Sequence, residues 1–284
     1  MNLLEQTKEL CRLYDIKPAR SKGQNFLIRE EIYDDIAAAA DLRPGDVVLE
    51  VGPGLGFLTA KLAEKAGRVI AVELDDKLAE VLRTGLMARG IKNVEVLNQN
   101  VLDVSMQSLL PSHQRAGYKI IANLPYNITS VFLRKFLSET ENKPELTVLM
   151  LQKEVAERII AKPGKMSLLA VSVQFYARPE IARMVERENF WPRPEVDSAI
   201  VRITPRPGPL LNKEREKEFF RLVKFGFIAK RKMLKNNLAA GFKINQEEAE
   251  NKITKAGFNS KIRAQELSID DWLRLFSLFN KTVV

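Results

Sequence analysis

The sequence predicts an α/β fold built on a mainly parallel sheet, followed by a small helical domain. Two observations lead to this prediction. Short runs rich in β-branched residues alternate with longer amphipathic stretches through most of the chain, as in repeated βα units. The segment TPRPGPL (204–210) then breaks all periodicity with three prolines and a glycine, and the pattern beyond it is helical.

The individual elements follow in order. After a short N-terminal helix and a loop, seven strands are expected at 47–51, 69–73, 94–98, 119–123, 146–151, 182–186 and 199–204. Amphipathic patterns such as LTAKLAEKA and DKLAEVLRTGLMARG connect the early strands. The last two strands lack a full crossover helix between them, which indicates an antiparallel edge pair. The proline-rich linker predicts two domains, 1–206 and 207–284.

Composition narrows the class of protein. Of the 284 residues, 45% are hydrophobic and 7% aromatic, which is typical of a soluble protein. No apolar run approaches the ~20 residues of a membrane span, and the N-terminal stretch lacks the apolar region of a secretory signal. The single cysteine, Cys11, excludes an internal disulfide and a cysteine-rich zinc site. We therefore expect a cytoplasmic protein without membrane association.

Positive charge is concentrated at the C-terminal end. The chain has 45 Lys and Arg against 36 Asp and Glu, a net charge of +9. From Pro207 onward there are 16 basic and 9 acidic residues, a net +7. Such clustering is expected for a polyphosphate partner, although a basic protein kept soluble by its charge would show it too.

A glycine-rich turn follows the first predicted sheet strand. VVLEV runs into GPGLG, with glycines at 52, 54 and 56. This spacing differs from the dinucleotide fingerprint and lacks the lysine of a phosphate loop. Glu50 precedes the turn and Glu73 ends the next strand, where an acid accepts hydrogen bonds from ribose hydroxyls. Unless these carboxylates are only caps, they favour a cationic nucleoside, so S-adenosylmethionine is predicted over NAD.

The fourth strand ends in an unusual group of residues, Asn123, Leu124, Pro125 and Tyr126. An exocyclic amine of a base is a poor nucleophile because its lone pair is delocalised into the ring. Two acceptors, the Asn123 side-chain oxygen and a backbone carbonyl freed by Pro125, would orient that amine and stabilise the charge that grows on its nitrogen. Tyr126 offers a stacking face for the base. Positioning of this kind requires neither a covalent nucleophile nor a metal.

The chain closely resembles the dimethyladenosine transferases of small-subunit ribosomal RNA over nearly its whole length. The matching segments are KGQNFL (22–27), LEVGPGLGFLT (49–59), AVELD (71–75), ANLPYNI (122–128), FWPRPEVDSA (190–199), KRKMLKNNL (230–238) and AQELSIDDWLRLF (264–276). The resemblance implies the class I (Rossmann-like) S-adenosylmethionine-dependent methyltransferase fold, with a seven-stranded mainly parallel sheet and a small all-α C-terminal domain.

The resemblance also implies roles for individual residues. The catalytic group would be Asn123, Leu124, Pro125 and Tyr126, with Phe190 stacking on the target adenine opposite Tyr126. The donor would be bound by Gln24, Asn25, Leu27, Gly52, Gly54, Glu73, Leu74, Asn100, Val101 and Asn123. Where the family usually has an Asp that accepts from the donor's adenine amine, this chain has Asn100, which should weaken donor binding by about 1 kcal/mol.

The implied reaction is N6-dimethylation of two adjacent adenosines in a hairpin loop near the 3′ end of 16S rRNA. The implied substrate is an assembling small ribosomal subunit, and we expect a monomer. Three alternatives remain: a large-subunit rRNA methyltransferase of the macrolide-resistance type, a DNA adenine methyltransferase, and a non-catalytic assembly factor. The motif NLPY (123–126) and the basic C-terminal helices favour the small-subunit rRNA as the target.

Other conspicuous residues are expected to have ordinary roles. His113 lies in a polar loop, where a surface position is favoured over a proton acceptor. Cys11 is expected to be half-buried, and Trp191 and Trp272 are expected to pack rather than stack on bases. The run KRK (230–232) is interpreted as an RNA phosphate contact rather than a solvated helix face.

Overall fold

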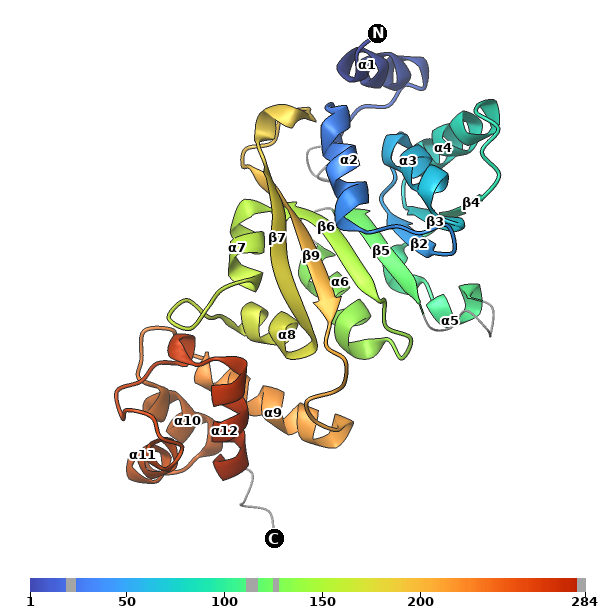
Figure 1. Ribbon diagram of the computed structural model, residues 1–284. Helices are drawn as coiled ribbons and strands as arrows, with labels where there is room; N and C mark the ends of the chain where they lie inside the picture. Colours follow the sequence, from blue (N-terminus) through green and yellow to red (C-terminus); the bar gives the residue numbers. More distant parts are fainter. Residues whose placement is uncertain (19–23, 111–116, 125–127, 280–284) are drawn as a thin grey trace. The chain divides into compact units, whose positions relative to one another are not determined.

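A computed structural model describes residues 1–18, 24–110, 117–124 and 128–279 of the protein (Figure 1). Contacts within the chain divide it into two units. The first contains Met1–Ala156 and Arg178–Pro205, and the second contains Glu157–Ala177 and the chain from Arg206 onward. Within the described ranges, no helix has the length and apolarity needed to cross a membrane.

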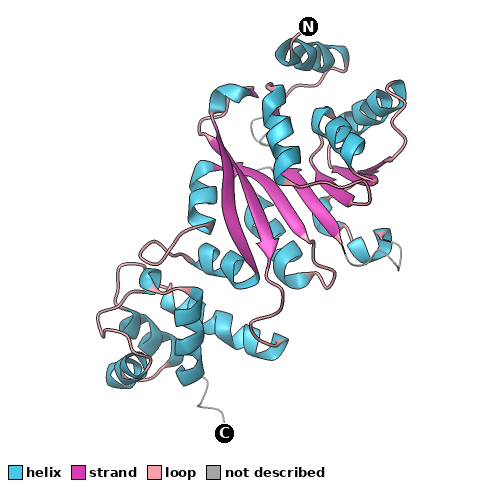
Figure 2. Ribbon diagram, in the orientation of Figure 1, coloured by secondary structure: helices cyan, strands magenta, loops and turns pink. Residues whose placement is uncertain are grey.

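The first unit is organised around a seven-stranded sheet with helices on both faces (Figure 2). The strand order is β4-β3-β2-β5-β6-β9-β7. Strands β4, β3, β2, β5 and β6 are parallel to one another, and β9 is antiparallel to β6. The strands are β2 (Val47–Val51), β3 (Arg68–Glu73), β4 (Val94–Asn98), β5 (Tyr118–Asn123), β6 (Leu146–Gln152), β7 (Ala177–Val185) and β9 (Ser198–Pro205).

The central strands are apolar because helices cover both of their faces. Every residue of β2 is buried, and so is β5 up to its last residue, as expected for the inner strands of a parallel sheet. The helices of this unit are α1 (Leu3–Leu13), α2 (Glu30–Ala39), α3 (Phe57–Lys65), α4 (Asp76–Ala88), α5 (Met106–Leu109) and α6 (Thr129–Arg134). Helix α7 (Lys153–Ile159) continues into the second unit.

The predicted fold class is confirmed, and two details differ from the sequence expectation. The strand expected at 182–186 is β7, and it begins earlier, at Ala177. Its first half was missed because β7 lies at the sheet edge and its exposed positions include the charged Arg178 and Glu180. A separate two-stranded sheet of β1 (Phe26–Leu27) and β8 (Phe190–Trp191) was not predicted. Two-residue strands are too short to leave a periodic signal.

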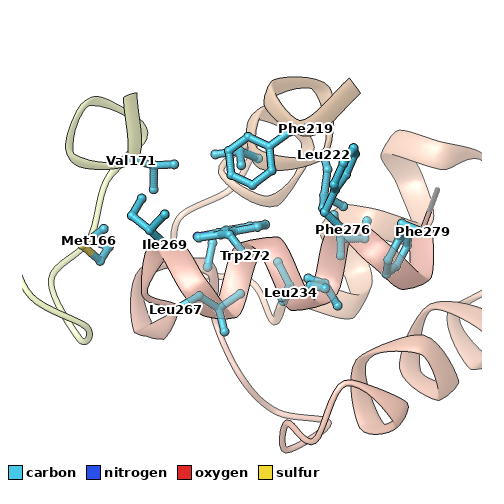
Figure 3. Packing of buried hydrophobic residues seen from close by; sticks show 14 of the residues in the cluster. Met166, Val171, Phe219, Leu222, Leu234, Leu267, Ile269, Trp272, Phe276 and Phe279 are labelled. Carbon is cyan, nitrogen blue, oxygen red and sulfur yellow. The ribbon is translucent and has the colours of Figure 1, made fainter. Parts of the chain in front are cut away.

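The second unit is a helical domain with its own apolar core. Its helices are α8 (Leu168–Tyr176), α9 (Lys213–Gly226), α10 (Leu234–Phe242), α11 (Gln246–Lys255) and α12 (Ile269–Phe279). Trp272 is completely buried at the centre of this core, among side chains from several helices (Figure 3). The packing role expected for Trp272 is therefore confirmed.

The division between the units differs from the single boundary predicted after residue 206. Residues 157–177 group with the C-terminal helices. Helix α8 contributes Ala170, Val171 and Phe175 to the helical core, and the Phe175 ring stacks on that of Phe219 at 4.8 Å. A helix that follows sheet strands in the sequence can thus pack elsewhere, which the linear pattern does not reveal.

Candidate active site

A cavity of about 360 Å³ lies at the carboxyl ends of the strands in the first unit. This is where open α/β sheets bind ligands. The cavity is lined by all ten residues predicted to bind the donor, namely Gln24, Asn25, Leu27, Gly52, Gly54, Glu73, Leu74, Asn100, Val101 and Asn123. The residues that end or follow β2 to β5 come together because these strands are adjacent and parallel, whereas Gln24, Asn25 and Leu27 come from the segment that ends in β1.

The glycine loop between β2 and α3 forms the floor of this cavity. Gly52 and Gly54 have φ angles of +68° and +58°, in the left-handed region that favours glycine. A Cβ on Gly52 would lie 3.5 Å from the Asn123 carbonyl oxygen, and one on Gly54 would lie 3.3 Å from the Phe26 ring. A side chain at either position would strain the backbone, and one at Gly54 would also crowd the Phe26 ring, so glycine fits this loop beside the cavity.

Glu73, at the end of β3, is held in place by backbone donors. Its Oε2 accepts from the Gly54 N–H at 3.1 Å and its Oε1 from the Asp75 N–H at 3.0 Å. Burial raises the pKa of this carboxyl, and the two backbone hydrogen bonds oppose the rise. Each oxygen keeps a further lone pair, so the carboxylate can also accept from ribose hydroxyls. The neighbouring Leu74 is 69% exposed and presents an apolar surface at the cavity.

Glu50 is a second acid in the cavity wall, and its carboxylate oxygens lack a hydrogen-bond partner among the residues that the structure describes. It is 1% exposed, and neither carboxylate oxygen has a hydrogen bond from a described residue. Burial raises the pKa of Glu50 to about 8; the nearby Thr59 hydroxyl opposes this without meeting hydrogen-bond geometry, and Glu73 adds to it. An orphaned buried carboxylate facing a cavity fits a cationic ligand.

Asn100 follows β4 and begins the 3-10 turn Val101–Asp103. Its Oδ1 accepts from the Leu102 N–H at 2.9 Å, so its side-chain oxygen already has one partner within the chain. A carboxylate here would keep a second oxygen for the ligand, whereas the amide has one oxygen for both tasks. Asn in place of Asp therefore leaves fewer acceptor oxygens at this position for a ligand.

The predicted catalytic group is described in part. Asn123 ends β5, lines the cavity and donates from Nδ2 to the Asn25 carbonyl at 3.5 Å. This bond turns the amide nitrogen toward the Asn25 carbonyl, and among the described residues no hydrogen bond to Oδ1 is found, so Oδ1 can act as an acceptor. Leu124 is 2% exposed and anchors the strand end in the core. Pro125 and Tyr126 lie outside the described residues, as does His113.

Phe190 is placed differently from the expectation. It pairs with Leu27 across the β1–β8 sheet, and its side chain is 3% exposed within the core cluster of the first unit. A ring buried to this extent has no free face for a base, so stacking by Phe190 stays a prediction. Cys11, expected to be half-buried, is 4% exposed. Trp191 is half-buried and packs beside Cys11, Ile16 and Phe26.

Several cavity residues were not singled out from the sequence. Tyr33, Phe26, Gln99 and Ile128 line the cavity, and Tyr33 donates from its hydroxyl to the Leu27 carbonyl at 3.0 Å. Tyr33 lies on α2 among acidic and alanine residues, where nothing in the local pattern distinguishes it. Phe26 and Ile128, by contrast, lie inside the segments KGQNFL and ANLPYNI and could have been included.

The basic run Lys230–Lys232 belongs to the second unit. All three side chains are exposed, in the turn between α9 and α10. Asn237 fixes this turn by donating from Nδ2 to the carbonyls of Gly226 at 2.7 Å and Ala229 at 3.0 Å. A fixed, exposed set of cations is suited to contact phosphates.

The fold and the cavity together define a class I S-adenosylmethionine-dependent methyltransferase. The glycine loop, the backbone-anchored Glu73 and the buried Glu50 all line this cavity, and their chemistry fits a cationic nucleoside such as S-adenosylmethionine.

Comparisons with known proteins give the family. Residues 17–281 match the profile of the family described as Ribosomal RNA adenine dimethylase. A ribosomal RNA small subunit methyltransferase A from Dehalococcoides mccartyi (strain CBDB1) is 44% identical over 274 residues, covering 96% of this chain and 92% of the relative. The chain belongs to the ribosomal RNA adenine dimethylase family.

Two solved structures resemble the protein over most of its length. A dimethyladenosine transferase from Plasmodium falciparum superposes with a TM-score of 0.76 at 27% identity, covering 90% of this chain and 98% of the other. The 23S rRNA methyltransferase ErmE superposes with a TM-score of 0.72 at 30% identity, covering 89% and 98%. The protein is accordingly an S-adenosylmethionine-dependent rRNA adenine dimethyltransferase.

Proposed function

We propose that this enzyme dimethylates the 6-amino nitrogen of two adjacent adenosines in the hairpin loop near the 3′ end of 16S rRNA, acting as a cytoplasmic monomer on the assembling small subunit. The family match and the small-subunit name of the 44% identical relative support this target. The weaker similarity to a 23S enzyme supports the large subunit as the alternative.

The position of Asn123 is the observation that carries the proposal. Its amide stands at the end of the central strand β5, in the wall of the donor cavity, with its nitrogen turned to the Asn25 carbonyl. The free Oδ1 accepts one hydrogen of the adenine amine, and the Leu124 carbonyl accepts the other. These acceptors hold the amine lone pair toward the cavity and stabilise the positive charge that develops on nitrogen.

The donor is held by residues from four strand ends. S-adenosylmethionine supplies the methyl group when bound. Glu73 accepts from its ribose hydroxyls, while Asn100 and Val101 hold its adenine. Glu50 compensates its positive charge, and Gly52 and Gly54 let the backbone approach it. Tyr126 and Phe190 are proposed to stack on the target base, which requires the Phe190 ring to become exposed from its present buried position.

The second unit supplies affinity for RNA rather than chemistry. Its exposed run Lys230–Lys232 contacts phosphates, which carry most of the sequence-independent binding energy to nucleic acids. Loop adenosines suit the enzyme because an unpaired base can be turned out of its stack into the site.

Mapping methylated adenosines tests the proposal directly. Undermethylated small and large subunits are incubated separately with wild-type enzyme and donor, and dimethyladenosine is located in each rRNA. We expect two adjacent dimethyladenosines in the small-subunit hairpin and none in 23S rRNA. Modification of the large subunit would support the alternative, and no modification of either would leave the assembly-factor alternative. Light scattering of the purified chain tests the monomer.

A further inference from the structure

One lysine outside the cavity holds a loop that forms part of its wall. Lys135 begins the π-helical turn Lys135–Glu139 that continues α6. Its ammonium donates to the Val104 carbonyl at 2.9 Å and to the Leu102 carbonyl, both in the segment that follows Asn100. The side chain is half-buried and does not line the cavity itself.

The segment held by Lys135 is short and has few internal bonds. The Asp103 N–H donates to the Asn100 carbonyl at 2.9 Å and the Val104 N–H to the Val101 carbonyl at 3.2 Å. A single 3-10 turn of this kind is weakly stable by itself. Asn100, Val101 and Leu102 nevertheless line the cavity, so their position determines its shape. The lysine provides charge-assisted hydrogen bonds that fix the turn from behind.

Lys135 also connects this loop to the catalytic strand. The chain runs from Asn123 at the end of β5 to Ile128, which lines the cavity, and then enters α6 and the π-helical turn. Single π-helical turns are often found at functional sites. The Lys135 side chain thus links the helical segment that follows Asn123 along the chain to residues 102–104, which follow the proposed adenine contact Asn100.

We propose that Lys135 is a positioning residue for the methyl donor, holding residues 100–104 in the conformation that receives the donor's adenine. This rests on the proposed donor site. Lys135 therefore sets donor affinity and leaves the rate of transfer at saturating donor nearly unchanged. If removal of the ammonium lets the loop occupy its binding conformation about one tenth of the time, apparent affinity falls about tenfold.

The chain offers a matched control in Lys119. Lys119 lies on β5, near the end of the strand opposite to Asn123, and does not line the cavity. It donates to the Asp41 carbonyl at 2.5 Å and pairs with Asp46 at 2.8 Å, with only 8% of its side chain exposed. Like the half-buried Lys135, the buried Lys119 donates to a backbone carbonyl, but that carbonyl is not in a segment that lines the donor cavity.

The experiment compares Lys135→Met, Lys135→Arg and Lys119→Met in the full-length protein. The dissociation constant of S-adenosylhomocysteine is measured by calorimetry, and KM for S-adenosylmethionine and kcat are measured on undermethylated small subunits. For Lys135→Met we expect both the dissociation constant and KM to rise about tenfold, with kcat within about twofold of wild type. Lys135→Arg should stay within about threefold, and Lys119→Met should lose stability without losing affinity.

Other outcomes distinguish a failure of the role inferred for Lys135 from a failure of the proposed donor site. Wild-type affinity in a folded Lys135→Met, or a fall in kcat without a rise in KM, would overturn the inference. An equal loss of donor affinity in Lys119→Met would also overturn the inference, because the effect of Lys135→Met would then be a general loss of stability. Failure of the wild-type protein to bind S-adenosylhomocysteine would instead contradict the proposed donor site. If Lys135→Met does not fold, Lys135→Gln is judged by the same criteria.

Discussion

Replacing Glu50 with glutamine tests the electrostatics of the donor cavity. The carboxyl is 1% exposed and unpartnered, and burial raises its pKa from the ordinary 4.5 to about 8. Between these values the folded protein keeps the proton while the unfolded chain releases it. The contribution of this group to stability is therefore fully present below about pH 4.5 and decreases as the pH rises toward 8.

The size of the effect follows from the shift. At pH 7, which is about 2.5 units above the ordinary pKa and still below the raised one, the folded state keeps a proton that the unfolded chain has released, and at ~1.36 kcal/mol per unit this costs about 3 kcal/mol. Glu50→Gln has nearly the same shape and cannot ionise. Without donor, we expect the variant to be more stable than wild type by a few kcal/mol at pH 7 and to show little difference at pH 4.5.

The same carboxyl makes donor binding depend on pH. A cationic donor favours the ionised form, whose fraction with a pKa of about 8 rises about 20-fold between pH 6 and pH 7.5. The donor's own amino group, with a pKa of about 7.7–8.0, stays mostly protonated over this range. Affinity should rise by up to that factor in wild type, with close to one proton released per donor, and should be nearly independent of pH in Glu50→Gln.

Denaturant unfolding at several pH values measures the stability, and calorimetry in buffers of different ionisation enthalpy measures the protons released. Among the described residues, Glu73 acts on Glu50 through its charge, which is negative, while burial raises the pKa of the Tyr33 hydroxyl and keeps it neutral in this pH range. A wild-type affinity that does not change from pH 6 to 7.5, or a Glu50→Gln variant less stable than wild type at pH 7, would refute the reasoning.

Three further predictions concern other parts of the molecule. Asn123→Ala should lower tritiated methyl transfer by a factor on the order of 10² to 10³ while subunit binding stays nearly intact, because it removes an acceptor that acts on the developing charge; wild-type incorporation would contradict this. Asn100→Asp should tighten donor binding up to about fivefold, or ~1 kcal/mol, by freeing an oxygen; equilibrium dialysis that shows weaker binding would argue against it. Changing Lys230, Arg231 and Lys232 to glutamine should reduce the salt dependence of subunit binding by about 2–3 in logarithmic slope without changing donor affinity, and an unchanged slope would remove this run from the interface.

The assembly-factor alternative is tested with the same Asn123→Ala variant. If subunit assembly depends on binding rather than on methylation, the variant should rescue a slow-assembly phenotype as well as wild type does. No rescue would count against that role. The comparison is informative because the substitution is expected to leave the basic surface of the second unit unchanged.

The sequence by itself determined the sheet and the place of the donor site. Parallel strands bring their carboxyl ends to one edge, so Gly52, Glu73, Asn100 and Asn123 had to meet once the strands were identified. The glycine loop could be read locally as well, because positive φ angles leave a residue-type signature.

Only the tertiary structure decided the properties that depend on surroundings. The raised pKa of Glu50 comes from burial without a partner, and the burial of Phe190 comes from pairing with a strand far away in the sequence. The transfer of residues 157–177 to the helical unit and the reach of Lys135 to the Leu102 and Val104 carbonyls likewise join distant segments. Local patterns report backbone preference and periodicity, whereas desolvation and long-range contact exist only once the chain has folded.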